Sequence, residues 1–417
     1  MNLSLSGMSE SSARHLLLEC YAEALRAVDG RRAVRERLAA NKTAAPVYVL
    51  AIGKAATAMM WGALDALGDD LAQGLLITKQ GYADPAQVDT RLQIMEAEHP
   101  VPGAASLAAG QTMLDFLASL PPQAPLITLI SGGSSALVEV LPAGLTITQL
   151  QQVNDWLLAS GWDIERMNQL RRSISGIKGG RLLGYVGERA VLNLLISDVP
   201  GDDPAIIGSG LLVPPRHEDV LTSDEHELLP SWLQSILADL TVSHVDGFSH
   251  VQTEILRSNN DARVAVVDFA KARGIAVHHH TDLLQGDAIK TGEMIAAEVM
   301  AGKSGLHVWG GETTVCLPPS PGRGGRCQSL ALAAAQVLAG SEIFLLAAGT
   351  DGSDGPGEDA GALVDGETTL RAKQEGYLAR QSLQAVDAGS LLEASGDLLQ
   401  TGPTGSNVMD LVLVFKP

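Results

Sequence analysis

The sequence predicts an α/β fold built around a mostly parallel, doubly wound sheet. Short apolar runs that suit buried strands alternate with longer stretches that suit helices, for example residues 46–52 followed by residues 54–67. Such alternation is typical of parallel sheets with helices on both faces. The length of 417 residues exceeds that of most single domains, so we expect two domains.

The first predicted domain is Rossmann-like and spans residues 1–240. Glycine or serine directly follows several of its predicted strands. Ligands of parallel sheets bind beyond the carboxyl ends of the strands, which places a binding site at these turns. The predicted elements are a helical stretch at about 10–40, a strand at 46–52, a helix at 54–67, a strand at 75–78, a helix at 104–117 and strands at 126–130 and 191–196.

The second predicted domain is smaller, of mixed α/β type, and spans residues 241–417. The boundary lies in a polar stretch at about 214–250. A second alternating series follows this stretch, so the same physical argument applies to it. The series consists of a helix near 260–273, a strand at 275–279, a helix near 287–300 and strands at 306–309 and 343–348.

The composition predicts a soluble, cytoplasmic protein. A net charge of −19 disfavours binding to nucleic acid or to an anionic membrane, because both would repel the protein. The apolar runs are far shorter than the roughly 20 residues of a membrane-spanning helix, and the N-terminus lacks the pattern of a secretion signal. The 3 cysteines are too few and too scattered for a disulfide framework, which fits a reducing compartment.

The run at 347–361 crowds glycines and carboxylates into one loop after an apolar strand. Glycine allows the backbone to turn with positive φ and to approach a ligand closely. Asp351 and Asp354 in this run offer the oxygen ligands that Mg²⁺ prefers beside phosphate. The loop therefore predicts a site for a metal and a nucleotide.

A second candidate turn follows the strand at 126–130. Its backbone amides and hydroxyls could cradle phosphate oxygens, as anion-binding turns before helices do. A turn that merely connects two elements is the alternative. The turn consists of Ser131, Gly132, Gly133, Ser134 and Ser135.

Charged residues stand at two further strand ends. Lys54 begins the helix at 54–67, where a cation is mildly unfavourable because the helix dipole is positive there. A contact with phosphate or carboxylate would offset this cost, and a solvent-exposed lysine is the alternative. Asp198 follows the strand at 191–196 and suits metal binding or a base that accepts a hydroxyl proton.

Three basic residues, Arg171, Arg172 and Lys178, form the strongest basic cluster of this acidic chain. They belong either to a solvated helix face or to an inward-facing anion site. Arg326 begins an apolar helix, where its planar guanidinium could hold a substrate carboxylate, with a surface loop as the alternative. The turn at 402–407 is either a simple turn or a polar contact to a ligand.

Three other patterns do not support a site. Residues 302–304 resemble the end of a phosphate-binding P-loop, but Ala297 stands where that motif requires glycine. The histidines at 278–280 alternate between the two faces of a strand, so at most two of them could share a metal. No G-x-G-x-x-G follows the first strand, which argues against a dinucleotide site.

Taken in order, eight segments resemble the glycerate 2-kinase family, whose members are often labelled hydroxypyruvate reductase and carry a C-terminal MOFRL domain. The resemblance spans nearly the whole chain and places the MOFRL region at about 305–412. The segments are residues 52–55, 131–135, 177–182, 197–204, 310–314, 324–326, 349–355 and 402–407.

The resemblance implies that ATP and Mg²⁺ are used to phosphorylate a small molecule, D-glycerate, at its 2-hydroxyl. Catalysis would then depend on positioning and on neutralisation of charge. A homodimer is compatible with this assignment. The implied catalytic residues are Lys54 for phosphoryl charge, Asp198 as base and Arg326 for the glycerate carboxylate; the turn at 131–135, Lys178 and Asn407 would bind the nucleotide, and Glu312, Asp351 and Asp354 are candidate metal ligands.

The chain departs from the family pattern at Leu211, Cys327, Ser329 and Met409. Because of these departures, a non-catalytic protein that binds a nucleotide or a metabolite is an alternative to the kinase. A second alternative is an NAD(P)H-dependent hydroxypyruvate reductase, as the common label suggests. The missing dinucleotide motif counts against the reductase.

Overall fold

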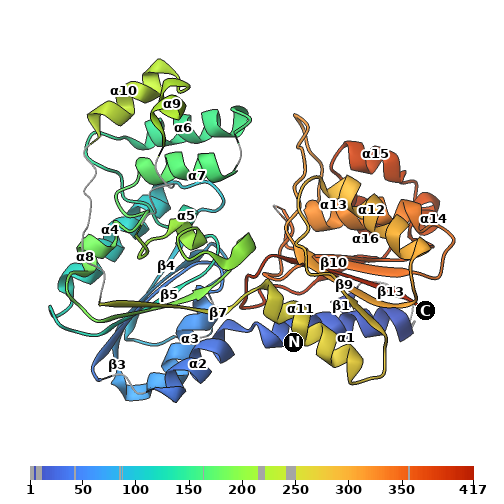
Figure 1. Ribbon diagram of the computed structural model, residues 1–417, viewed down its shortest axis with the longest axis horizontal. Coiled ribbons are helices and arrows are strands. Elements are labelled where there is room, and N and C mark those ends of the chain that lie inside the picture. The colour runs from blue at the N-terminus through green and yellow to red at the C-terminus, as the bar shows by residue number, and fades with distance from the viewer. Residues whose placement is uncertain are drawn as a thin grey trace. The chain divides into compact units, whose positions relative to one another are not determined.

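The computed structural model describes residues 4–5, 12–41, 44–83, 86, 88–162, 164–214, 221–240, 250–355 and 357–417. The chain divides into two compact units (Figure 1). The central unit consists of residues 30–256, and the terminal unit consists of residues 1–29 together with residues 257–417. Each unit has its own sheet and its own apolar core.

The central unit is built on a six-stranded sheet with the strand order β4-β3-β2-β5-β6-β7. Strands β2 to β6 pair in parallel with their neighbours, which confirms the predicted parallel sheet. The strand β5 is buried along its whole length, as expected for a strand covered on both faces. The strands are β2 (Val47–Ile52), β3 (Leu71–Lys79), β4 (Leu92–Ala97), β5 (Leu126–Ile130), β6 (Val191–Ile196) and β7 (Val251–Arg257).

Helices flank both faces of this sheet, with α3 on one side and α4 on the other (Figure 1). Four further helices, α6, α7, α9 and α10, form a separate group with its own apolar cluster around Val153, Leu170 and Leu233. The helices are α2 (Gly30–Ala40), α3 (Ala56–Leu67), α4 (Ala104–Ser119), α5 (Ser134–Leu137), α6 (Ile147–Ala159), α7 (Ile164–Ser173), α8 (Leu183–Val186), α9 (Ser223–Glu227) and α10 (Ser231–Asp239).

The terminal unit is built on a seven-stranded mixed sheet with the strand order β1-β12-β11-β10-β13-β9-β8. Its neighbouring strands are antiparallel except for β8 and β9, which are parallel. This agrees with the predicted mixed α/β type. The strands are β1 (Ser4–Leu5), β8 (Val277–His279), β9 (Gly305–Gly311), β10 (Phe344–Gly349), β11 (Gly361–Val364), β12 (Leu398–Gln400) and β13 (Asp410–Lys416).

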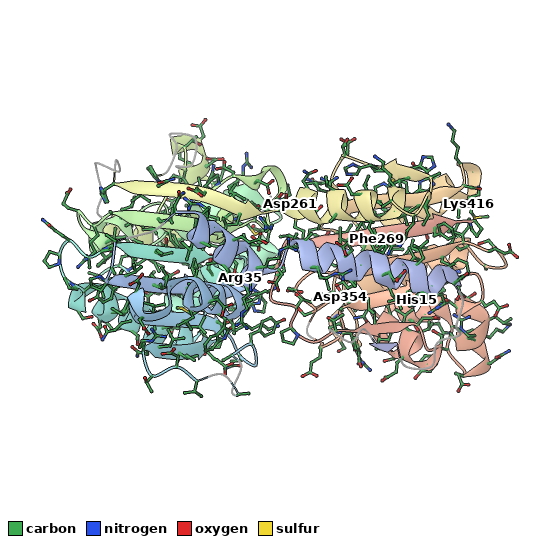
Figure 2. The ribbon with its side chains drawn as sticks, turned by 90° about the horizontal axis from the view of Figure 1, so that it is seen from below. His15, Arg35, Asp261, Phe269, Asp354 and Lys416 are labelled. Atoms are coloured by element: carbon green, nitrogen blue, oxygen red, sulfur yellow. The ribbon has the colours of Figure 1, made fainter. Side chains whose placement is uncertain are left out.

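The helices of the terminal unit form a layer on each face of its sheet (Figure 1). One layer consists of α1 and α11, which run side by side, with His15 on α1 and Asp261 and Phe269 on α11 (Figure 2). The other layer contains α12 and α13. The helices are α1 (Ser12–Ala27), α11 (Asn259–Lys271), α12 (Ala288–Ala301), α13 (Arg326–Val337), α14 (Thr368–Gln374), α15 (Ala379–Gln384) and α16 (Ala388–Ala394).

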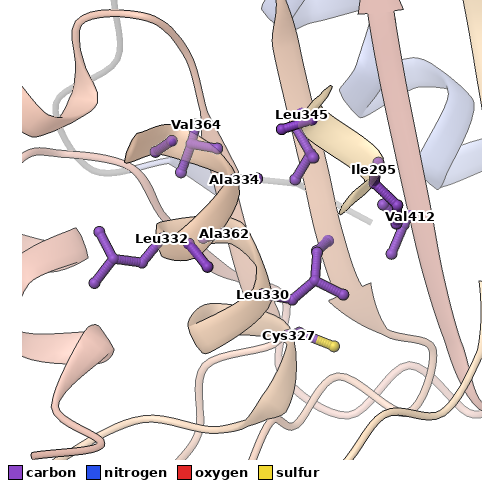
Figure 3. Packing of buried hydrophobic residues seen from close by; sticks show 14 of the residues in the cluster. Ile295, Cys327, Leu330, Leu332, Ala334, Leu345, Ala362, Val364 and Val412 are labelled. Atoms are coloured by element: carbon purple, nitrogen blue, oxygen red, sulfur yellow. The ribbon is translucent and has the colours of Figure 1, made fainter. Parts of the chain in front are cut away.

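Helix α13 is buried in the core of the terminal unit (Figure 3). Its residue Leu330 packs in the same cluster as Leu345 of β10 and Val412 of β13. Gly292 of α12 allows α12 to lie against α13, because a Cβ at that position would stand 2.2 Å from the carbonyl oxygen of Leu330. Among the helices of the described ranges, none is long and apolar enough to cross a membrane.

The two units do not follow the boundary at residue 240 that we expected from the sequence. Helix α1 belongs to the terminal unit, because its Arg14 is buried there against residues 363–365 and residue 397. Its guanidinium bonds Asp365 (2.5 Å), Asp397 (2.8 Å) and the carbonyl oxygen of Leu363 (2.8 Å). A buried charge is stable only when it is paired and hydrogen-bonded, so these contacts hold α1 in place.

We predict that Arg14→Met destabilises the terminal unit by about 1–3 kcal/mol, because Asp365 and Asp397 lose their buried partner and keep only the part-exposed Arg371. Denaturant unfolding of the full chain measures the loss, and hydrogen exchange locates it in α1 and β11. The control is Arg26→Met on the same helix, where the arginine is exposed and pairs with Glu23. We expect the control to change stability by less than about 0.5 kcal/mol. Equal effects of the two substitutions would contradict the structural role of Arg14.

Candidate active site

Two turns of the central unit meet where β2 and β5 end. The N–H of Lys54 donates to the carbonyl oxygen of Gly132 (2.9 Å), and the N–H of Ala55 donates to Ser131 Oγ (3.0 Å). Gly53 has a φ of 133°, and a Cβ there would stand 2.1 Å from Ser131 Oγ. Glycine is therefore required at position 53, and Ser131 fixes the start of α3.

The turn after β5 presents only some of its residues to an open space. Gly133 and Ser135 line a pocket of about 370 Å³ at the carboxyl end of the parallel sheet. Ser131 and Ser134 are buried, and Ser134 Oγ lies against Gly208. A Cβ at Gly133 would stand 3.2 Å from atoms of both Lys54 and His99, which places these side chains beside the turn. Part of the predicted phosphate cradle thus faces the pocket, with Lys54 next to it.

Polar and charged side chains from several elements line the same pocket. Asp198, which directly follows β6, lies in its wall together with Ser209. Ser209 has a positive φ of 61°, and its hydroxyl lies 2.9 Å from that of Ser135. Non-glycine residues in this conformation are uncommon and cluster at functional sites. The other charged or amide side chains of the wall are Glu139, Asn154, Asn168, Arg171 and Lys178.

Lys178 is a buried member of an ion pair. Its Nζ lies 2.5 Å from Glu139 Oε2, and both side chains are almost fully buried. The other oxygen of Glu139 accepts a hydrogen bond from Ser175 Oγ (2.6 Å). Because Glu139 neutralises it, Lys178 mainly holds the pocket wall together. Its predicted contact with the nucleotide stays a prediction.

In the terminal unit, Asp354 caps helix α13. Its carboxylate accepts hydrogen bonds from the N–H groups of Cys327 (3.0 Å) and Gln328 (2.8 Å). Gly325 makes room for it, because a Cβ there would stand 2.2 Å from Asp354 Oδ1. Burial raises the pKa of Asp354 to about 7, and the charge of Asp410 adds to the rise, whereas the two N–H donors lower it.

Arg326 lies at the start of α13, between two carboxylates. It forms a bidentate pair with Asp410, with distances of 2.6 and 2.9 Å, and its Nη1 lies 2.5 Å from Glu312 Oε1. Burial lowers the pKa of Arg326, but Asp410 and Glu312 outweigh burial and raise it. Such a pair is well suited to fix a helix end. The guanidinium already binds the protein's own carboxylates, so the structure gives no support to its predicted contact with a substrate carboxylate.

The three predicted metal ligands do not form a ligand set. Asp354 is committed to α13, Glu312 pairs with Arg326, and Asp351 Oδ1 accepts hydrogen bonds from the N–H (2.9 Å) and hydroxyl (3.1 Å) of Ser353. Among the residues that the structure describes, no three His, Cys, Asp or Glu side chains gather as metal ligands do. In this structure these carboxylates bind groups of the loops around α13, and their predicted contact with Mg²⁺, direct or through water, stays a prediction.

The turn that precedes β13 is tied to the acidic loop after β10. Thr350 Oγ1 donates to the carbonyl oxygen of Met409 (2.6 Å) and accepts from the N–H of Val408 (2.8 Å). Tyr21 of α1 donates to the carbonyl oxygen of Gly349 (2.6 Å) beneath this junction. Asn407 is buried beside it, and its role in nucleotide binding stays a prediction.

Comparison with known proteins assigns the chain to a family. Residues 16–229 match a domain of unknown function (DUF4147), and residues 305–410 match the MOFRL family. A D-glycerate 2-kinase of Thermotoga maritima is 34% identical to this chain, over 96% of this chain and 98% of that protein. The chain belongs to the glycerate 2-kinase family. A glycerate 2-kinase of Pyrococcus horikoshii is 31% identical, over 96% of this chain and 97% of that protein.

A solved structure of a glycerate kinase has the same fold as this chain. The crystal structure of a glycerate kinase from Thermotoga maritima matches with a TM-score of 0.83 at 32% identity, over 97% of this chain and 100% of that chain. A protein of Agrobacterium vitis that is 37% identical, over 87% of this chain and 97% of that protein, carries the provisional name hydroxypyruvate reductase. The reductase label thus occurs within the same family as the kinases.

The departures from the family pattern are buried packing positions. Leu211 belongs to the apolar core of the central unit, and Cys327 belongs to that of the terminal unit (Figure 3). Ser329 lies on the buried side of α13. Met409 is also buried and has a positive φ of 65°, a conformation that asparagine adopts more readily. None of these four residues is among those that line the pocket described above.

Several residues of these sites were not predicted from the sequence. Glu139 and Asn154 stand in segments without a turn motif, and Asp410 follows the turn at 402–407 at the start of a strand. Their roles come from partners far away in the chain: 39 positions separate Glu139 from Lys178, and 84 separate Asp410 from Arg326. The sequence signal for Asp410 is its position shortly after the turn at 402–407.

We predict that Asp354 makes the stability of the terminal unit depend on pH. Because the pKa of Asp354 is raised to about 7, the folded state keeps a proton that the unfolded chain loses near pH 4. This stabilising effect is complete below pH 4 and is lost as the pH rises through 7. Asp354→Asn is neutral throughout, so the stability of the wild type relative to this variant should fall by a few kcal/mol between pH 5 and pH 8, measured by denaturant unfolding.

Asp365→Asn is the control in the same unit. Burial raises the pKa of Asp365, but Arg371 outweighs burial and lowers it, so this carboxylate is ionised over the same pH range. Its substitution should cost the same stability at pH 5 and pH 8. A constant difference between the wild type and Asp354→Asn would show that Asp354 is ionised throughout.

Proposed function

We propose that this protein transfers the γ-phosphoryl group of ATP to the 2-hydroxyl of D-glycerate. The observation that carries the proposal is the pocket at the carboxyl end of the parallel sheet, which brings Gly133, Ser135 and Asp198 together. Kinases among the relatives imply a nucleotide substrate and a small-molecule acceptor. The pocket combines a turn suited to phosphate with a carboxylate suited to a hydroxyl group.

The proposed reaction assigns a role to each of these groups. The glycerate hydroxyl oxygen forms a bond with the γ-phosphorus, the bond between that phosphorus and the β,γ-bridging oxygen breaks, and ADP leaves. Asp198 accepts the hydroxyl proton. Lys54 lies beside Gly133 and would neutralise phosphoryl charge, which is the main contribution that proteins make to phosphoryl transfer.

Mg²⁺ would accompany ATP. The ion usually keeps several waters and is bound by substrate phosphates with one or two carboxylates, rather than by a dedicated protein cage. Glu312, Asp351 and Asp354 do not form such a cage. A homodimer and a cytoplasmic location are further parts of the proposal, and they rest on the family and on the composition alone.

The deciding experiment incubates the full chain with ATP, Mg²⁺ and D-glycerate and identifies the product by phosphorus NMR. We expect 2-phosphoglycerate, with L-glycerate and tartronate as comparison acceptors. A 3-phosphoglycerate product would change the assigned hydroxyl. Oxidation of NADH or NADPH by hydroxypyruvate, without phosphate transfer, would instead support the reductase, and nucleotide binding without any product would support a non-catalytic relative.

We predict that Asp198→Asn lowers kcat by about 10²- to 10⁴-fold, because an amide cannot accept the hydroxyl proton. The KM for D-glycerate should change far less. The matched control is Asp202→Asn in the same loop, which does not line the pocket and whose φ of 53° asparagine tolerates. We expect kcat of this control to stay within about twofold of the wild type. Equal rates for the wild type and Asp198→Asn would remove Asp198 from the mechanism.

A further inference from the structure

Two guanidinium or ammonium groups line the pocket of the central unit, and their charges are balanced differently. Lys178 is neutralised by Glu139 at 2.5 Å. Arg171 of α7 has two hydrogen-bond acceptors, and both are neutral amide oxygens, those of Asn154 and Asn168. Within the described part of the chain, no carboxylate pairs with Arg171. The pocket therefore contains one arginine whose charge the protein does not balance.

The neighbours of Arg171 hold its side chain toward the pocket. Asn154 Oδ1 accepts a hydrogen bond from Arg171 Nε (3.2 Å), and Asn154 Nδ2 donates to the carbonyl oxygen of Leu150 (3.1 Å), which fixes the amide on α6. Asn168, one turn earlier on α7, accepts from Arg171 Nη1 (3.4 Å). Helix α6 itself begins at a capping box formed by Thr146 and Gln149, so its register is well defined.

These contacts use only part of the donor capacity of Arg171. A guanidinium carries five N–H groups, and the two amides accept two of them. Arg171 lines the pocket, and none of its nitrogens is among the buried polar atoms that lack a partner. Burial lowers the pKa of Arg171 because it disfavours the charged guanidinium, and an anion beside this group would offset that effect.

We infer that Arg171 binds the carboxylate of the acceptor substrate, as a bidentate pair formed by the outer N–H groups of its guanidinium. This inference rests on the proposed function and names the residue that selects a small hydroxy acid. It transfers to Arg171 the role that the sequence suggested for Arg326, whose guanidinium is occupied by Asp410 and Glu312. Arginine suits this task because its planar fork matches the geometry of a carboxylate.

The charges of the wall favour a single carboxylate beside Arg171. Glu139 and Lys178 cancel, Arg171 keeps a positive charge that no carboxylate of the described residues balances, and Asp198 lies in the same wall. Lys54, which lies beside Gly133, is already assigned to the phosphoryl group, so Arg171 is the cation left for the acceptor. A hydroxy acid brings one negative charge for Arg171 and a hydroxyl for Asp198. The pocket thus complements the acceptor in charge and in hydrogen bonding.

The test is the steady-state kinetics of Arg171→Met, which keeps the length of the side chain and removes the charge. We expect the KM for D-glycerate to rise by about 10- to 100-fold, as for the loss of a hydrogen bond to a charged group, and the KM for ATP to change by less than about twofold. The matched control is Arg166→Met, on the same helix but outside the pocket, where Arg166 pairs with Glu225. The control should leave both values unchanged.

A second variant tests the inference even if Arg171→Met does not fold. Asn168→Asp is nearly isosteric and places a carboxylate beside Arg171 Nη1, so it should neutralise the guanidinium and also raise the KM for D-glycerate. An unchanged KM for D-glycerate in both variants would overturn the inference. A rise confined to the KM for ATP would also overturn it, because Arg171 would then bind phosphate.

Direct binding separates this inference from the proposed function. Calorimetry should show that the wild type binds D-glycerate more tightly than its uncharged amide, and that Arg171→Met binds the two equally. If the wild type makes no phosphoglycerate but shows this preference, the proposed function fails and the anion site stands. If the wild type binds D-glycerate no better than the amide, or if Arg171→Met keeps the preference, the inference fails even where the enzyme is active.

Discussion

The close approach of two turns in the central unit determines how its site is arranged. Gly53 lies so near Ser131 that a side chain at position 53 would overlap the serine hydroxyl. This approach lets Ser131 bind the first turn of α3 and brings Lys54 beside Gly133. Parallel strands end at one edge of a sheet, so residues that follow β2, β5 and β6 converge there. The wall of the pocket follows from this convergence.

Charge balance distinguishes the groups that organise the structure from those that are open to a ligand. Arg14 and Arg326 each contact two carboxylates, and Lys178 contacts one, so these three cations hold helices and loops in place. Arg171 contacts amides instead. Desolvating a charge is costly unless an opposite charge is near. The partner of a buried cation therefore says more about its role than does the glycine-rich segment in which the cation stands.

The sequence predicted strands β2, β3, β5 and β6 of the central unit well, because short apolar runs such as 126–130 that end at glycine or serine are typical of buried strands. It did not predict the edge strand β4, whose exposed positions interrupt the apolar pattern, or the strands β11 to β13 of the terminal unit. The boundary differed because Arg14 pairs with residues 351 and 383 positions away, and no local pattern reports such a contact.

The sequence predicted which residues lie at the candidate site better than it predicted what each residue does there. Lys54, Ser135 and Asp198 were chosen because they follow strands, and the structure places them at one end of the sheet. Arg171 and Arg172 could not be told apart, because neighbours on a helix point about 100° away from each other and the sequence does not say which direction faces the pocket. The sequence could not show that Asp354 caps α13, because the two N–H groups that it accepts from lie 26 and 27 positions earlier.

The assignment of α1 to the terminal unit has a consequence for synthesis on the ribosome. Helix α1 is synthesised before the central unit, whereas Leu363, Asp365 and Asp397, which bind its Arg14, are synthesised after it. The central unit is complete in between and contains its own core, so it can fold while α1 still lacks its partners. The apolar side of α1, with Leu17 and Tyr21, stays exposed until then. The terminal unit therefore cannot close around α1 until Asp397 has been synthesised.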